Sequence, residues 1–162
     1  MSLRLTFIPC QFWGRIPLAL RAGIGIRWNM TEAEVMAACG EGGIREMVAA
    51  FYQRVRTDDL IGPMYPDQDW AGAEERLAGF LLFRLGASTA YLESRGHPRL
   101  KMRHLPFQIG IPERDRWLEL MSAAMDEVGT PAGAREFLDP FFAQVADFMR
   151  NRPEPADHPS GA

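Results

Sequence analysis

The stretch SRGHPRLKMRHLPF, residues 94–107, holds two of the three histidines of a chain otherwise rich in apolar helical patterns. Pro98 can occupy the first turn of a short helix, whereas Pro106 cannot continue one. The stretch therefore predicts about two helical turns that end just after His104. This places an imidazole on the last turn of a short helix.

His104 is a candidate metal ligand. Leu100 lies four residues before it and Phe107 three residues after it, so we expect the imidazole to face apolar packing. A lone imidazole over an apolar pocket beside cations suits haem, because iron binds the nitrogen and the cations meet the propionates. The alternative is a core histidine beside a solvated basic face, which is the commoner arrangement. The cations expected near solvent are Arg99, Lys101 and Arg103.

Length and composition indicate one globular domain. The chain has 162 residues, of which 47% are apolar and 24% charged, and no apolar run approaches the length that spans a membrane. A net charge of -3 provides no general attraction to nucleic acid. Cys10 and Cys39 lie far apart without a CxxC pattern, which argues against a zinc site and favours a reducing, cytoplasmic compartment.

The two ends of the chain differ from its body. Residues 1–29 contain four arginines and no acid, so we interpret them as an extension outside the core, or as a misassigned start of translation. A natural start is indicated at residue 30, because Thr31 and Glu34 can form a capping box. The domain is expected over residues 30–151. Residues 152–162 resemble a disordered tail, which argues against the third histidine, His158, as a ligand.

Two helices are predicted in the first part of the body. A short one runs from about residue 32 to 39 and ends at Gly40, after which Gly42 and Gly43 permit a sharp change of direction. The next helix has one continuous apolar face that directs Tyr52 inward. This face comprises Ile44, Met47, Val48, Phe51, Tyr52 and Val55.

Further helices follow a corner that contains Tyr65. Asp69 can cap a helix in which Ala73, one turn before Leu77, leaves room for a close helix or a ligand, while Arg76 lies toward water. A loop is expected over residues 88–96. A helix then starts near residue 111 and directs Trp117 inward, and the final helix must kink at Pro140 or begin after Asp139.

Several ordered motifs closely resemble the group II truncated haemoglobins. The similarity runs from about residue 30 to 151. The motifs are Gly42-Gly43, Phe51-Tyr52, Tyr65-Pro66, residues 73–77 (AEERL), residues 95–107 (RGHPRLKMRHLPF) and residues 113–118 (ERDRWL). The resemblance implies an all-α, two-over-two helical sandwich that encloses a haem. Two departures from the family pattern, Gly86-Ala87 in place of a glycine pair and Pro140, concern a loop and a helix and lie outside the pocket motifs.

The same resemblance implies roles for individual residues. His104 matches the histidine that ligates the iron of haem b, and Arg103 beside it is the candidate propionate contact. Ala73 stands where other globins often place a distal histidine, and Leu77 packs on the haem. Tyr52, Tyr65 and Trp117 match the distal side, where O2 binds.

The chemistry expected of such a pocket is retention of O2, and of the related ligands NO and CO. Each hydrogen bond to a charged acceptor contributes about 1.5–3 kcal/mol, so three donors predict slow release. That suits an NO-dioxygenase or peroxidase-type reaction better than oxygen transport. Turnover would require a separate reductase, because the sequence has no flavin or nicotinamide motif.

Two other classes of function stay open at this point. One is a non-catalytic haem-based gas or redox sensor, which needs an output surface or partner. The other is a haem-free helical interaction module, in which His104 and the aromatic residues are only core. The sequence decides neither the physiological ligand nor whether the chain acts as a monomer or a homo-oligomer.

Overall fold

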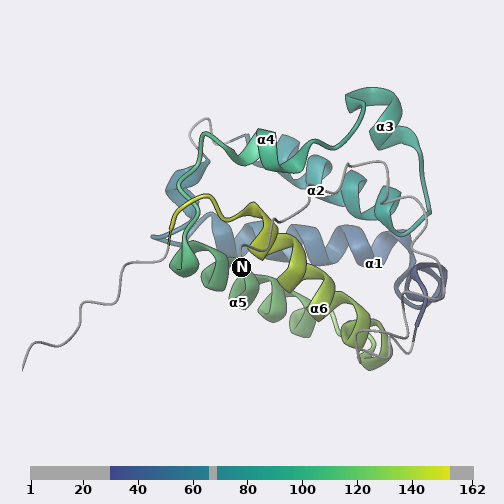
Figure 1. Ribbon diagram of the computed structural model, residues 1–162. Coiled ribbons are helices and arrows are strands. Elements are labelled where there is room, and N and C mark those ends of the chain that lie inside the picture. Colours follow the sequence, from purple (N-terminus) through teal and green to yellow (C-terminus); the bar gives the residue numbers. More distant parts are fainter. Residues whose placement is uncertain (1–29, 66–68, 154–162) are drawn as a thin grey trace, which may run out of the picture.

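The computed structural model describes residues 30–65 and 69–153, and within these ranges it consists of helices without β-strands (Figure 1). The predicted extension at residues 1–29, the second residue of the Tyr65-Pro66 motif, and His158 lie outside the described residues. The helices, in chain order, are α1 (Glu32–Val55), the 3-10 turn η3 (Gly62–Met64), α2 (Trp70–Arg84), α3 (Ala90–Arg95), α4 (Leu100–His104), α5 (Ile111–Glu127) and α6 (Ala132–Met149).

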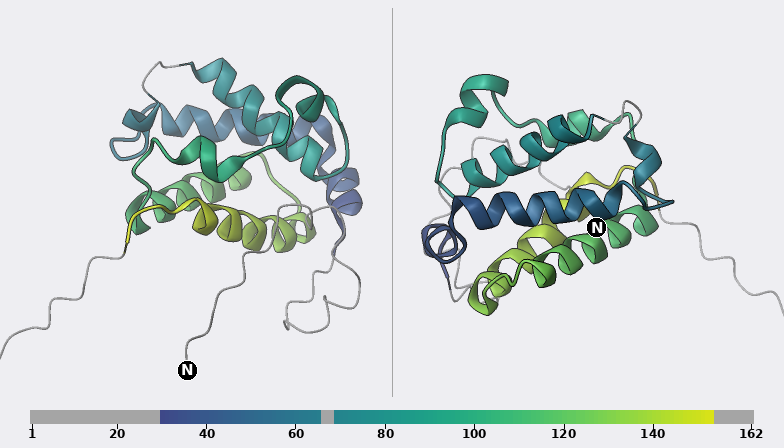
Figure 2. Two further views of the ribbon diagram at one scale, coloured as in Figure 1. Left: turned by 45° about the horizontal axis from the view of Figure 1, so that its top comes forward. Right: turned by 180° about the vertical axis from the view of Figure 1, so that it is seen from behind.

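Four long helices form two layers. Helix α1 packs against both α2 and α5, and α5 packs in turn against α6. Figures 1 and 2 show two antiparallel pairs, α1 with α2 and α5 with α6, stacked on one another. This is the two-over-two arrangement that the family resemblance implies. None of the described helices combines the length and the apolar character of a membrane span.

A capping box sets the start of helix α1, and a glycine sets its bend. The capping box is present, since the Glu34 N–H donates to Thr31 Oγ1 at 3.3 Å and the Thr31 N–H donates to Glu34 Oε2 at 2.6 Å. Gly40 has a φ of 68° and interrupts the helical path, as its predicted role as a terminator requires. The expected turn at Gly42 and Gly43 is wrong, because both are helical and Gly40 makes the change of direction alone.

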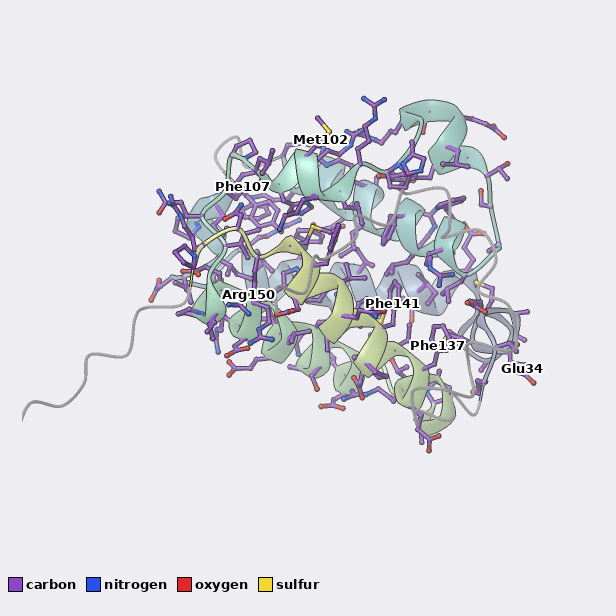
Figure 3. All side chains as sticks on the ribbon, in the orientation of Figure 1. Glu34, Met102, Phe107, Phe137, Phe141 and Arg150 are labelled. Carbon is purple, nitrogen blue, oxygen red and sulfur yellow. The ribbon has the colours of Figure 1, made fainter. Side chains whose placement is uncertain are left out.

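The predicted inner face of α1 forms the centre of the core. Its six apolar members, Tyr52 included, are at most 5% exposed. Phe141 and its neighbours on α6 meet this core from the other layer, whereas Met102 on α4 lies on the outside of the molecule (Figure 3). Burial of this apolar surface is the main force that holds the layers together.

Helix α2 has well-defined ends. The Gly72 N–H donates to the Asp69 carboxylate at 3.0 Å, which confirms Asp69 as the N-cap. At the other end Gly86 has a φ of 77°, and the Ala87 N–H donates to the Leu82 carbonyl at 2.8 Å in a Schellman turn. One glycine therefore suffices here, and Ala87 leaves the turn intact.

One expectation about helices is wrong. Residues 90–95 form α3 rather than part of a loop, and Tyr91 within it is buried. Of the two alternatives for the last helix, a start after Asp139 is excluded, because α6 begins at Ala132 and contains Pro140. Buried aromatic residues on both sides of the proline hold the helix together across it. Tertiary packing thus outweighs the local cost of the proline.

Candidate functional site

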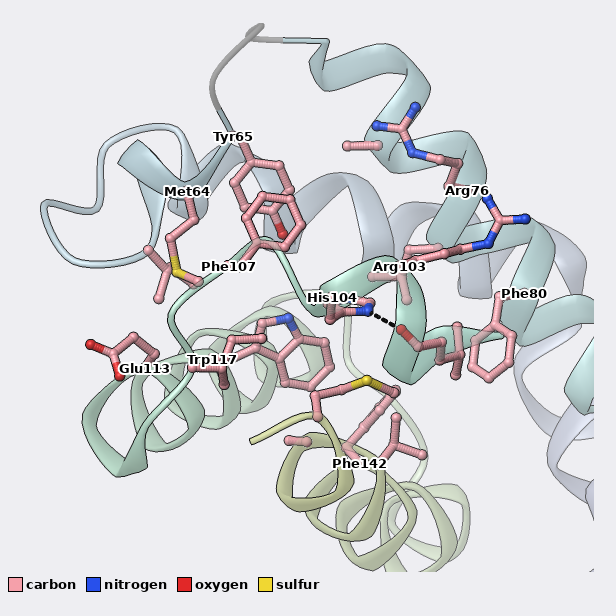
Figure 4. A pocket seen from close by; sticks show the side chains of 18 of the residues that line it. Met64, Tyr65, Arg76, Phe80, Arg103, His104, Phe107, Glu113, Trp117 and Phe142 are labelled. Carbon is pink, nitrogen blue, oxygen red and sulfur yellow. Dashed lines mark hydrogen bonds between the residues drawn. The ribbon is translucent and has the colours of Figure 1, made fainter. Parts of the chain in front are cut away.

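A cavity of about 660 Å³ is lined by side chains from all six α-helices and from the corner at η3 (Figure 4). Its size falls within the usual range for small-molecule and cofactor sites. The structure brings every site residue proposed from the sequence to this one cavity. These residues are Tyr52, Tyr65, Ala73, Leu77, Arg103, His104 and Trp117.

His104 is held as a neutral imidazole. Its Nδ1 lies 2.8 Å from the Leu100 carbonyl oxygen, and because a carbonyl can only accept, Nδ1 carries the hydrogen (Figure 4). The Nε2 lone pair is therefore free for a ligand bond. Burial lowers the pKa of His104 from its ordinary value, which favours the same neutral form. This is the state in which a histidine binds a metal.

The helix that carries His104 is shorter than the sequence predicts. It starts at Leu100 rather than at Pro98, because Arg99 adopts a left-handed conformation with φ 43° and ψ 40°. The result is a helix of five residues, none of which is buried. The imidazole is therefore presented by a short surface helix and not by a core element.

The cations around His104 have different partners. Arg103 lines the cavity, and its guanidinium donates to the carbonyls of Pro98 at 3.0 Å and Arg95 at 3.2 Å. Lys101, expected near solvent, instead donates to the Phe148 carbonyl at 2.8 Å. Among the three expected cations, only Arg103 faces the site.

Three further cations at the cavity were missed. Arg95 and Arg114 line it, and so does Arg76, which was expected to lie toward water. Arg76 Nη1 donates to the Asp69 carboxylate at 2.8 Å, which holds the guanidinium beside the cavity (Figure 4). Arg76 follows Ala73 by three residues, about one helical turn, and this spacing indicates that both side chains lie on the cavity-facing side of α2. With Arg103, the lining thus offers four guanidinium groups to an anionic ligand group.

Tyr52 and Tyr65 meet edge to face, with ring centroids 5.7 Å apart. Burial raises the pKa of Tyr52 well above its ordinary value, and the neighbouring Tyr65 hydroxyl raises it further. Burial also raises the pKa of Tyr65. Both phenols therefore stay protonated at neutral pH.

Trp117 on α5 is wedged between two aromatic side chains. Its ring centroid lies 5.1 Å from that of Phe51 and 5.6 Å from that of Phe142. Figure 4 shows the indole nitrogen on the side of the ring that faces the cavity. The core thus fixes the position of a third N–H or O–H donor.

Helix α2 forms an apolar wall of the cavity. Ala73 is 2% exposed, and its methyl group leaves space that a larger side chain would fill. Leu77 lies one turn further along the same face. Apolar lining residues not proposed as site residues from the sequence complete the cavity. They include Met64, Phe80, Leu81, Tyr91, Phe107, Phe142, Val145 and Met149.

The residues present fit a haem. Within residues 30–65 and 69–153 no group of three or more metal-ligating side chains comes together, so His104 offers a single protein ligand. A flat apolar macrocycle with two carboxylates matches one imidazole, an apolar cavity and a rim of guanidinium groups. A metal ion held by protein ligands alone does not match this set.

Comparisons with known proteins agree with this geometry. The model of the bacterial-like globin family matches residues 37–151. Group 2 truncated hemoglobin YjbI of Bacillus subtilis is 38% identical over 123 residues, which cover 76% of this chain and 92% of that protein. A thermostable hemoglobin from Thermobifida fusca is 44% identical, with a TM-score of 0.70 over 77% of this chain and 100% of that one. A truncated oxygen-avid haemoglobin from Bacillus subtilis is 38% identical, with a TM-score of 0.69 over 72% and 98% of the two chains.

Proposed function

Since this chain belongs to the bacterial-like globin family, as a group II truncated haemoglobin that binds haem and O2, we propose that His104 ligates the iron of haem b and that Tyr52, Tyr65 and Trp117 retain the O2. Bound haem supplies an iron with one open position for a diatomic ligand. The observation that carries the proposal is the hydrogen bond from His104 to Leu100, which leaves Nε2 free on a half-buried, neutral imidazole. Arg103 and the other rim guanidinium groups would hold the propionates.

The distal donors favour slow release of ligand. Both phenols keep their protons, and the indole N–H always donates, so all three side chains can bond to a diatomic ligand with partial negative charge. One such bond contributes about 1.5–3 kcal/mol, or about ten- to hundredfold in the dissociation rate. The similar Bacillus subtilis haemoglobin is described as oxygen-avid. We extend the same behaviour to this chain, with NO and CO as further ligands.

Strong retention suits redox chemistry better than oxygen delivery. We propose NO-dioxygenase or peroxidase-type turnover, for which a reductase must supply electrons, because the sequence carries no flavin or nicotinamide motif. The alternative is a sensor function. In that case the protein would bind the ligand in the presence of a reductase without turning it over. A cytoplasmic location is part of the proposal, supported by the free thiol of Cys39.

The test is a haem titration of the purified protein, followed by absorption spectra in the ferric, reduced, O2 and CO states. His104→Ala is compared with His97→Ala, which removes the exposed histidine of the same segment. We expect wild type and His97→Ala to saturate near one haem per chain and to give stable O2 spectra, and His104→Ala to lose them.

Either of two results would contradict the proposal. Equal haem uptake with unchanged spectra in His104→Ala would remove His104 as the ligand. Absence of a specific haem complex in the wild-type protein would leave a helical module whose aromatic residues serve only as core.

A further inference from the structure

Helix α4 lacks the apolar anchor that fixes the other helices. It has no buried residue, and Met102 is 64% exposed on its outer side (Figure 3). Leu105, directly after the helix, is 59% exposed. Polar contacts therefore help to hold His104 in position. Arg103 bonds to the segment just before α4, and the polar contacts to another long helix come from the C-terminal end of α6.

Asn151, two residues after α6, uses its whole amide on the segment around His104. Its Nδ2 donates to the carbonyl of His104 at 3.1 Å and to that of Phe107 at 2.7 Å. Its Oδ1 accepts from the Ile109 N–H at 3.0 Å, and its own N–H donates to the Ile109 carbonyl at 2.9 Å. Both side-chain donors and the acceptor are thus committed to residues 104–109.

Lys101 makes a second link between α4 and the end of α6, and here the donor lies on α4. Its Nζ donates to the carbonyls of Phe148 at 2.8 Å and of Arg150, and it lies 5.6 Å from the centroid of the Phe148 ring. A cation at these carbonyls is favoured by the helix dipole as well as by hydrogen bonding. Figure 1 shows the end of α6 passing close to α4, and the two helices are in contact.

We propose that Asn151 is a positioning residue for His104, and that with Lys101 it forms a two-point clamp that fixes the imidazole toward the haem iron. The inference rests on the proposed function, because it assumes that His104 ligates the iron. Asn151 acts on the backbone of His104, while the bond from Nδ1 to Leu100 sets the rotation of the ring. Helix α6 thereby couples the core to an otherwise superficial ligand helix.

The variant Asn151→Asp tests the clamp alone, because aspartate has the same shape as asparagine and keeps the oxygen that accepts from Ile109. It replaces the NH2 group, which supplies both donors, with an oxygen that repels the carbonyls of His104 and Phe107. Arg152→Ala is the matched control, since that side chain is exposed and its backbone bond to Ile109 is retained. The probe is the iron–imidazole stretching band of the reduced, haem-loaded full chain, measured by resonance Raman spectroscopy.

We expect the band to shift or broaden in Asn151→Asp and to stay unchanged in Arg152→Ala. In the same haem-loaded samples, the amides of Arg103 and Leu105 should exchange their hydrogens about tenfold faster in Asn151→Asp, because the bonds to the carbonyls of His104 and Phe107 are lost. If that variant does not fold, Lys101→Met tests the other half of the clamp, with a smaller shift of the band expected.

An unchanged band in Asn151→Asp, or in Lys101→Met where the first variant fails to fold, would overturn the clamp while leaving His104 as the ligand. Failure of the proposed function has a different signature, because the wild-type protein itself would then show no iron–imidazole band.

Discussion

The two sides of the cavity are built in different ways. The distal wall, defined here as Tyr52, Tyr65 and Trp117, takes two of its three members from α1 and α5, helices of 24 and 17 residues with many buried side chains. The ligand side consists of α4, five residues long and without a buried residue. The proposed donors Tyr52 and Trp117 are thus held by packing, whereas the proposed iron ligand His104 is held by hydrogen bonds. Mutations should therefore have different consequences on the two sides.

The largest expected difference is in stability. Phe51 is fully buried and its ring lies 5.1 Å from those of both Tyr52 and Trp117, so Phe51→Ala should lower the free energy of unfolding by about 3–5 kcal/mol. Leu105→Ala on the ligand side should change it by no more than about 0.5 kcal/mol, because that side chain is largely exposed. Urea unfolding at one fixed haem concentration measures both.

Comparable losses in these two variants would show that the ligand side also depends on apolar packing. The contrast between the two walls would then be wrong. A second readout comes from the same samples, since Phe51→Ala should also loosen Tyr52 and Trp117 and so speed O2 dissociation.

The next effect concerns the donors themselves. Trp117→Phe removes one N–H and keeps an aromatic ring between Phe51 and Phe142, so O2 should dissociate about ten- to hundredfold faster. Tyr52→Phe should act in the same direction. Stopped-flow dissociation of O2 provides the measurement, with Phe80→Leu as a control that alters the apolar lining without removing a donor. Unchanged rates in both donor variants would refute the donor role.

Most of this distal wall could be predicted from the sequence because it lies on long helices. The 3.6-residue period of α1 placed Tyr52 inward, and the capping residues Thr31 and Asp69 fixed the helix starts. The resemblance to group II truncated haemoglobins then indicated His104, which composition alone left as an ordinary core histidine. Periodicity and caps are local signals, and the structure preserves them.

The ligand side was harder to predict because tertiary contacts decide it. Helix α3 is too short to show a period, and the left-handed Arg99 moved the start of α4 past Pro98. Asn151 gave no signal, since a single polar residue near the chain end carries no pattern. Arg76 gave only the weak signal of its spacing from Ala73, and its bond to Asp69 holds it beside the cavity.

A smaller effect is expected at the corner that carries Tyr65. Asp58 accepts from the Ile61 N–H at 2.9 Å and from Arg116 at 2.6 Å. Burial alone would raise the pKa of Asp58, but these bonds hold it below its ordinary value. The unfolded chain therefore binds the proton more readily, so the stabilisation is present above about pH 4 and is lost as the pH falls further.

Asp58→Asn should lower the free energy of unfolding by about 1–2 kcal/mol at neutral pH and should flatten its decline in acid. Glu119→Gln is the control, because that exposed carboxylate also pairs with Arg116, at 2.9 Å, and should contribute less than about 1 kcal/mol. Urea unfolding at a series of pH values separates them. A decline in acid as steep in Asp58→Asn as in the wild type would argue against the linkage.

The smallest effect tests the backbone of the ligand side. Arg99 precedes α4 in a left-handed conformation that costs a non-glycine residue about 1–2 kcal/mol, so Arg99→Gly removes this strain. Glycine also increases the entropy of the unfolded chain by a similar amount, and we expect a net stabilisation below about 0.5 kcal/mol. Gln53→Gly, at an exposed right-handed position of α1, should instead destabilise by about 1 kcal/mol. Opposite signs in thermal unfolding would show that Arg99 stores backbone strain and that the exposed face of α1 at Gln53 does not. If Arg99→Gly lowers the free energy of unfolding as much as Gln53→Gly does, the left-handed conformation of Arg99 stores no strain that glycine can relieve.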